Sequence, residues 1–128
     1  MIAHLNVPSL ESNDNFPSSL SKKIVTGLLK DRLKFKGLII TDALGMKGVT
    51  SYDKENIDLM AFKAGNDVLL MSGDINAGIS SIVNAYKSNE ISEKRLQHSV
   101  KKILKAKYKV GLNRYKTIDT NNLISDLN

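Results

Sequence analysis

The chain has 128 residues, of which 41% are hydrophobic and 25% are charged, a composition typical of one globular domain with a modest core. It contains no cysteine, which excludes disulfides and thiolate metal sites, and no motif in it predicts a cofactor or a metal site. No apolar run approaches the roughly 20 residues that a membrane-spanning helix needs, so no membrane span is predicted. The cellular location stays open.

The net charge of +6 raises the possibility of nucleic-acid binding. Much of the excess lies on one long predicted helix and its tail, at Lys94, Arg95, Lys101, Lys102, Lys105, Lys107, Lys109, Arg114 and Lys116. Lysines spaced around an amphipathic helix usually form its solvated face. Aromatic residues make up only 5% of the chain, and none alternates with these lysines as a stacking platform would. No nucleic-acid partner is therefore predicted.

The first predicted elements are a strand and a helix. Ile2–Val7 reads as a short strand, and a polar loop with turn-forming residues follows it. The apolar residues between Leu20 and Leu33 recur with helical spacing, which predicts a helix with Ser19 or Ser21 as its cap.

A continuous apolar run, Leu38–Ile40, predicts the second strand, because such a run suits a strand buried on both faces of a parallel sheet. The run passes into Thr41 and Asp42. A carboxylate at the C-terminal end of a buried parallel strand lies where α/β folds place their chemistry. Asp42 is therefore a candidate catalytic residue, although an aspartate in this position can also cap a helix or bind loop amides.

The second half of the chain repeats the pattern. Ile57–Lys63 predicts a helix that ends at Gly65, and Asp67–Met71 predicts the third strand. Asp74 is the expected cap of a helix with one apolar face, formed by Ile75, Ile79, Ile82, Val83 and Tyr86. Ser92 is the expected cap of a last helix with a buried stripe, formed by Leu96, Val100, Ile103 and Leu104.

Three strands that alternate with helices indicate an α/β fold with a parallel sheet and right-handed crossovers. Three strands do not complete such a domain, because a closed (β/α)8 barrel takes roughly 250 residues. The sequence therefore predicts that this chain is the C-terminal part of a larger domain.

Four sequence blocks occur in order: Ala3–Pro8, Pro17–Ser21, Phe35–Gly48 and Ala64–Leu70. Together they resemble the later part of the catalytic barrel of glycoside hydrolase family 3, with its β-N-acetylhexosaminidase branch as the nearest. The resemblance implies a partial (β/α)8 TIM barrel, namely the last three βα units plus a C-terminal helix. Residues 1–115 would form the C-terminal half of the family's N-terminal catalytic barrel domain, and residues 116–128 a linker or tail.

The resemblance also implies a function. In that family the aspartate of the block (S/T)-D-x-L-x-M-x-G is the nucleophile, and Asp42 matches it. A retaining glycosidase needs such an ionised carboxylate beneath the anomeric carbon, where it forms a covalent glycosyl-enzyme. The implied activity is hydrolysis of O-glycosyl bonds in β-N-acetylglucosaminides, with peptidoglycan turnover as the expected setting.

His4 and Met46 match the same branch and are candidate substrate-binding residues. His4 is expected either to bond the sugar or a pocket loop, or to be a structural histidine satisfied by neighbouring strands. Met46 is expected to pack in the pocket. Two other polar residues are expected to be structural: Asp67 as an acceptor for backbone amides, and His98 as a solvated side chain on the last helix.

No residue of the chain is a candidate for the general acid that retention also requires. The resemblance places that group, and the residues that hold the sugar, upstream. The expected partners are therefore a carbohydrate substrate and the upstream half of the same barrel, and the isolated chain is expected to be inactive.

Two alternatives stay open. One is a receiver-like phosphoacceptor domain, which also ends a buried strand in an aspartate. Such domains have an acidic pair after their first strand and a lysine after their last, and this chain has neither at those positions. The other is a non-catalytic α/β domain.

Overall fold

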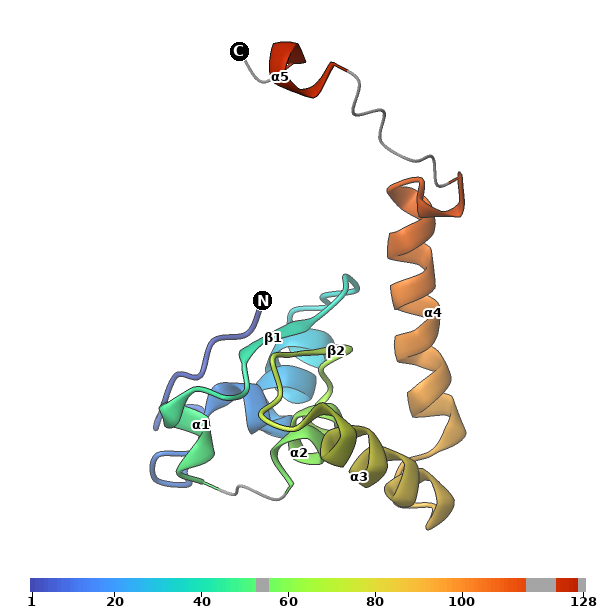
Figure 1. Cartoon of the computed structure of the whole chain (residues 1–128). Helices are drawn as coiled ribbons and strands as arrows, with labels where there is room; N and C mark the ends of the chain where they lie inside the picture. Colours follow the sequence, from blue (N-terminus) through green and yellow to red (C-terminus); the bar gives the residue numbers. More distant parts are fainter. Residues whose placement is uncertain (53–55, 115–121, 127–128) are drawn as a thin grey trace.

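The computed structural model in Figure 1 describes residues 1–52, 56–114 and 122–126. Strands β1 (Ile40–Ala43) and β2 (Val68–Leu70) pair in parallel, with Ile40 opposite Val68 and Ala43 opposite Leu70. The other elements are η1 (Ser18–Leu20), η2 (Lys23–Arg32), α1 (Lys47–Thr50), α2 (Ile57–Ala64), α3 (Ile75–Lys87), α4 (Glu93–Lys109), η3 (Leu112–Arg114) and α5 (Leu123–Asp126). Parallel strands connected through helices confirm the predicted α/β class. None of the described helices is long and apolar enough to cross a membrane.

The strand predicted over Ile2–Val7 is only partly formed. The amide of Ile2 donates to the carbonyl of Ile40 (2.8 Å), and the amide of Asp42 donates to the carbonyl of Ile2 (2.9 Å), so the chain begins in parallel register with β1. At Ala3 and Leu5 the backbone forms its hydrogen bonds with Ser18. This part of the segment therefore does not pair with β1. The prediction of a full strand was wrong, because the backbone groups of Ala3 and Leu5 are bonded to Ser18 and not to a neighbouring strand.

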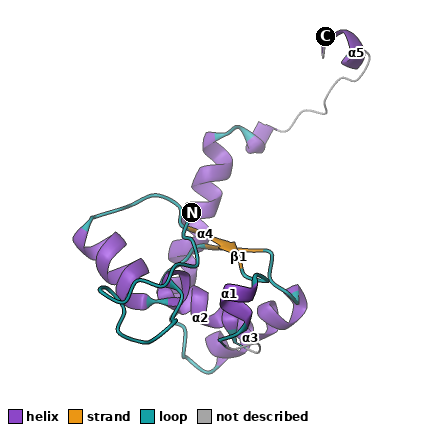
Figure 2. Ribbon diagram, turned by 90° about the vertical axis from the view of Figure 1, so that its left-hand side faces the viewer, coloured by secondary structure: helices purple, strands orange, loops and turns teal. Residues whose placement is uncertain are grey.

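Helix α2 lies at the centre of the apolar core. In Figures 1 and 2, α2 and α3 lie below the two strands. Three buried clusters meet at α2: Leu20, Leu44, Val49, Ile57 and Ala61; Val25, Ile39 and Ala64; and Phe62, Ala85 and Ile91. The helix ends at Gly65, as predicted, where a φ of 123° favours a residue without a side chain.

The predicted helix caps are confirmed. The carboxylate of Asp74 accepts from the amide of Ala77 (3.0 Å), and the hydroxyl of Ser92 accepts from the amide of Arg95 (3.2 Å). Ser21, ahead of η2, likewise accepts from the residue three positions on (3.2 Å). The helix that follows differs from expectation in its hydrogen bonding, since η2 is a π-helix.

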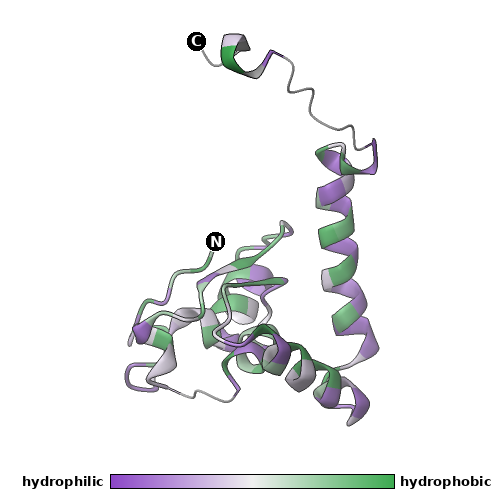
Figure 3. Ribbon diagram, viewed as in Figure 1, coloured by the Kyte–Doolittle hydropathy of each residue, from purple (hydrophilic) through white to green (hydrophobic). Residues whose placement is uncertain are grey.

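The apolar stripe of α4 was predicted to be buried, and this prediction is wrong, since none of its four residues is fully buried; the apolar face of α3 is also largely exposed. Ile75 on α3 is 65% exposed and Leu104 on α4 is 58% exposed, as are other members of both stripes to a lesser degree. Figure 3 shows these hydrophobic positions along the ribbon of α4. The fully buried residues of the two helices are small: Gly78, which lies close to Asp58 of α2, and Ala85 on α3, and Ser99 on α4. Ile82 of α3 and Leu96 of α4 are partly buried against the cluster of Phe62, Ala85 and Ile91.

The predicted tail, residues 116–128, falls mostly outside the described residues. The structure describes residues 122–126 of it, which contain the short helix α5.

Candidate active site

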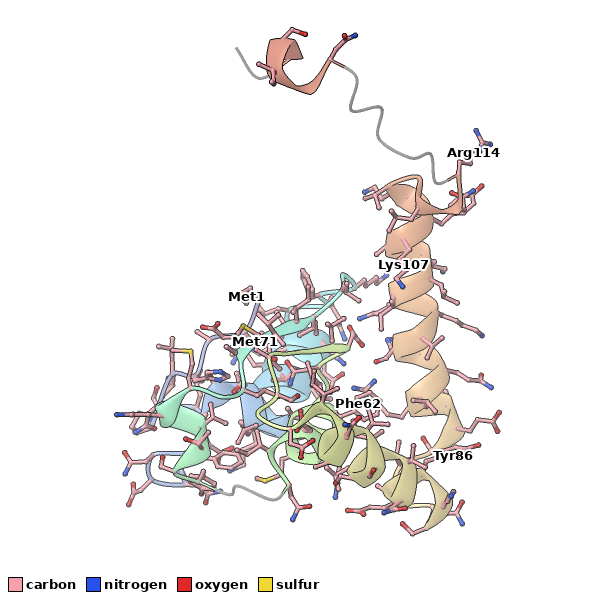
Figure 4. The ribbon with its side chains drawn as sticks, in the orientation of Figure 1. Met1, Phe62, Met71, Tyr86, Lys107 and Arg114 are labelled. Carbon is pink, nitrogen blue, oxygen red and sulfur yellow. The ribbon has the colours of Figure 1, made fainter. Side chains whose placement is uncertain are left out.

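Asp42 lies next to the last residue of β1, at the C-terminal end of the strand. Hydrogen bonds between the two strands continue past Asp42. The amide of Leu44 donates to the carbonyl of Leu70 (2.9 Å), and the amide of Gly45 donates to the carbonyl of Met71 (3.0 Å). Figure 4 labels Met71 at this end of β2. The side chain of Asp42 is half-buried, so it is held by the sheet and still open to a ligand.

The carboxylate of Asp42 is oriented by the backbone. Its Oδ1 accepts a hydrogen bond from the amide of Ala43 at 2.8 Å. The carbonyl of the same Ala43 accepts from Nε2 of His4 (3.0 Å) and from the amide of Met46 (3.1 Å). The three residues that the sequence selects therefore all contact Ala43: Asp42 and Met46 are its neighbours along the chain, and His4 comes from a separate part of it.

The ring of His4 is bonded on both sides by protein atoms. Nδ1 lies 2.6 Å from the hydroxyl oxygen of Ser19, and Nε2 lies 3.0 Å from the carbonyl of Ala43. Because a carbonyl oxygen only accepts, Nε2 carries a proton, and in a neutral ring Nδ1 then accepts from Ser19. In this arrangement each ring nitrogen already has a partner within the protein.

Met46 precedes α1, and its carbonyl accepts from the amides of Val49 (3.0 Å) and Thr50 (3.1 Å). Its side chain is 50% exposed. The thioether therefore lies beside the strand end without being taken up in the core.

A cavity of about 330 Å³ lies beyond the strand ends, lined by Leu44, Thr50, Ile57, Asp58, Gly73, Asp74, Ala77 and Gly78. Both of its carboxylates have structural roles, because Asp58 accepts from the hydroxyl of Ser72 and Asp74 caps α3. A larger cavity, about 650 Å³, lies between η2, α2 and the start of α4 and includes none of the predicted site residues.

Asp67 forms a second polar centre, immediately before β2. Its side chain is fully buried, and its Oδ2 accepts from the amide of Ile39 (3.0 Å), as predicted. The sequence did not predict its partners on α4: the hydroxyl of Ser99 donates to Oδ1 (2.7 Å), and Nζ of Lys102 lies 3.0 Å from Oδ2. Arg95 lies one turn before Ser99, with Nη1 3.9 Å from Oδ1. The spacing of these three polar residues along one helix face is the signal that could have revealed them.

This environment keeps Asp67 ionised. Burial by itself would raise the pKa of its carboxyl, but hydrogen bonds from Ser99, Lys102 and the amide of Ile39 outweigh burial and lower the pKa below its ordinary value. Arg95 also lies over the ring of Phe62, 4.1 Å from its centre (Figure 4 labels Phe62). The cluster joins α4 to the start of β2 and is structural. His98, on the same helix, is exposed, as predicted.

Among the described residues, no group of three or more histidine, aspartate or glutamate side chains is arranged to hold a metal ion.

Residues 1–106 match the model of the glycosyl hydrolase family 3 N-terminal domain. The chain is 38% identical over 101 residues to an uncharacterized secreted glycosyl hydrolase of Arthroderma benhamiae, covering 75% of this chain and 28% of that protein. It is 27% identical to beta-hexosaminidase A of Pseudoalteromonas piscicida, covering 86% of this chain and 22% of that protein.

Among solved structures, the chain is similar to a glycoside hydrolase family 3 β-N-acetylglucosaminidase from Paenibacillus sp. FPU-7. The TM-score is 0.80 at 27% sequence identity, over 88% of this chain and 22% of that protein. The chain thus spans about a quarter of the length of the relatives that it matches.

Proposed function

The chain belongs to glycosyl hydrolase family 3, and from this premise we propose that Asp42 is the nucleophile of a retaining glycosidase. The observation that carries the proposal is the position of Asp42 at the C-terminal end of a parallel strand, with its carboxylate oriented by the amide of Ala43. An oxygen of Asp42 attacks the anomeric carbon, and the bond from that carbon to the leaving oxygen breaks. The leaving oxygen takes a proton from an acid outside this chain. Water then hydrolyses the glycosyl-enzyme and releases the carboxylate of Asp42.

The same proposal places the chain in a larger barrel. The segment at Ile2, β1 and β2 would be the last three strands of a (β/α)8 barrel, with residues 1–115 as its C-terminal half. Two observations support this placement. Ile2 pairs in parallel with β1, and β1 pairs in parallel with β2. The chain is also similar to a family 3 structure, with a TM-score of 0.80. The upstream half of the barrel would supply the general acid and the groups that hold the sugar.

His4 and Met46 are proposed to shape the site around Asp42. Met46, with half of its surface exposed, is available to contact a sugar ring. His4 has a protein partner on each ring nitrogen, which favours an indirect role. A receiver-like phosphoacceptor domain is not favoured, because the family match extends over residues 1–106.

We propose a β-linked N-acetylglucosaminide as the substrate, and peptidoglycan turnover as its setting. The names of the Pseudoalteromonas and Paenibacillus relatives support the N-acetylglucosaminide. The tests use the longer protein and, for the roles of this chain's own residues, a barrel graft, defined as the Paenibacillus enzyme with its matching segment replaced by this chain.

The longer protein of which this chain would form part is expected to hydrolyse a 4-nitrophenyl N-acetyl-β-glucosaminide with a higher kcat/KM than the corresponding β-glucoside. Parallel assays of that protein on the two substrates measure the ratio, and a preference for the glucoside would contradict the proposed substrate. The barrel graft tests a separate point: it is expected to be active on the N-acetylglucosaminide, and an inactive graft would contradict the proposal that this chain completes such a barrel.

The 128-residue chain by itself is expected to show no glycosidase activity. Without residues that hold the sugar over Asp42, the reaction loses a positioning advantage of roughly 7–11 kcal/mol. Without a general acid it loses a further factor of about 10²–10⁴. A fluorogenic N-acetylglucosaminide assay checks this, with the barrel graft as the positive control. Activity of the chain alone that Asp42→Ala abolishes would show that the acid and the sugar site lie within it.

A further inference from the structure

We propose that His4 is a positioning residue for Asp42: its ring fixes the carbonyl of Ala43 and thereby holds the carboxylate of Asp42 in the geometry needed for attack. This inference rests on the proposed function, because it gives His4 a part in the reaction of Asp42. In this role His4 contacts the strand that carries the nucleophile, and it does not contact the sugar.

Ala43 connects the two side chains. Its amide donates to Oδ1 of Asp42 (2.8 Å), and its carbonyl accepts from Nε2 of His4 (3.0 Å) and from the amide of Met46 (3.1 Å). A rotation of the backbone at Ala43 would therefore disturb the contacts on both of its sides. The side chain that restrains the carbonyl also restrains the amide that orients the carboxylate.

The far side of the ring is anchored in the protein core. The residue Ser19, whose hydroxyl oxygen lies 2.6 Å from Nδ1 of His4, is fully buried. The carbonyl of Ser19 accepts from the side-chain amide of Asn66 (2.8 Å), which also donates to the carbonyl of Ala61 (2.7 Å). Asn66 is itself fully buried, at the turn between α2 and β2. The imidazole thus links Ser19, which is itself bonded to this buried turn, to the end of β1.

The anchor also selects the tautomer that the contact needs. A hydroxyl that donates to Nδ1 keeps the ring proton on Nε2, where the carbonyl of Ala43 accepts it. A carboxylate held in a fixed geometry before the substrate arrives gains from preorganisation, and a displacement of about 1 Å can cost about 100-fold in rate. This is the loss expected when the contact from His4 is removed.

The test compares three variants of His4 in the barrel graft. Glutamine carries an amide nitrogen at about the distance of Nε2 and can donate to the carbonyl of Ala43. Asparagine is equally polar but too short to reach it, and phenylalanine keeps the ring shape without a donor. His4→Phe and His4→Asn are expected to lower kcat by about 100-fold with KM nearly unchanged, and His4→Gln is expected to restore most of kcat.

Two results would overturn the positioning role. A raised KM with unchanged kcat in His4→Phe and His4→Asn would mean that His4 binds the sugar. Equal kcat in all three variants would mean that a hydrogen bond to the carbonyl of Ala43 does not affect the reaction. If His4→Phe does not fold, the comparison of His4→Gln with His4→Asn still decides, because both are polar and only the longer side chain can reach Ala43. Failure of the proposed function gives a different result, since Asp42→Asn would then retain activity whatever occupies position 4.

Discussion

Replacing Asp42 with asparagine in the barrel graft is expected to lower kcat by roughly 10⁴-fold or more, the scale of loss when a catalytic group is removed. A neutral amide cannot attack the anomeric carbon to form the glycosyl-enzyme. The local structure is expected to persist, because the side-chain oxygen of asparagine can still accept from the amide of Ala43 as Oδ1 of Asp42 does. Steady-state kinetics on an aryl N-acetyl-β-glucosaminide measure the loss.

Asp74→Asn is the matched control, since it makes the same chemical change near the same end of the sheet. Asp74 caps α3 through Ala77, and asparagine caps helices as well as aspartate does. The control is therefore expected to keep kcat near that of the unchanged graft. Near-normal turnover in Asp42→Asn, or an equal loss in both variants, would mean that Asp42 is not the nucleophile.

Replacing Asp67 with asparagine is expected to destabilise the fold by on the order of 3 kcal/mol. The buried carboxylate accepts from Ser99, from Lys102 and from the amide of Ile39. Its removal leaves the cations of Lys102 and Arg95, both mostly buried, without their counter-ion. Urea unfolding of the barrel graft with and without the substitution, followed by circular dichroism, gives the difference in the free energy of unfolding.

Glu90→Gln is the control for this second prediction. Glu90 forms an ion pair with Lys63 at 2.5 Å, but both side chains are nearly half exposed, so the pair is expected to contribute at most about 1 kcal/mol. A loss in Asp67→Asn no larger than that in Glu90→Gln would contradict the structural role of the Asp67 cluster.

The cost of Asp67→Asn is also expected to depend on pH. The pKa of Asp67 is lower in the folded state than in the unfolded chain, so the carboxylate stabilises the fold above the unfolded-state pKa of about 3.9. This contribution is lost as the pH falls from that value through the lower folded-state pKa. The difference between the two proteins should therefore be constant near neutral pH and shrink in strong acid, and a difference that grows on acidification would be inconsistent with an ionised Asp67.

The sequence determined the features that depend on neighbouring residues. Helical spacing and capping chemistry located α2, α3 and α4, and both Asp74 and Ser92 cap the helices that they were predicted to cap. The unbroken apolar run Leu38–Ile40 leads into β1 (Ile40–Ala43) and overlaps it at Ile40, and Asp42 lies near the C-terminal end of that strand, as predicted. These signals are local, since a cap, a glycine stop or a buried strand is encoded within a few residues of where it forms.

Only the tertiary structure decided which residues distant in the sequence share a contact. It brings His4 to Ala43, and nothing in their spacing along the chain encodes that contact, whereas the contact of Met46 with Ala43 is a local turn. It also attaches α4 through the polar residues Ser99 and Lys102, while the apolar stripe that predicted burial stays largely exposed. Helical periodicity shows that a helix has an apolar face, but the partner available in space decides which face is buried. For α4 that partner is the buried charge of Asp67, because a carboxylate removed from water requires donors wherever the fold can supply them.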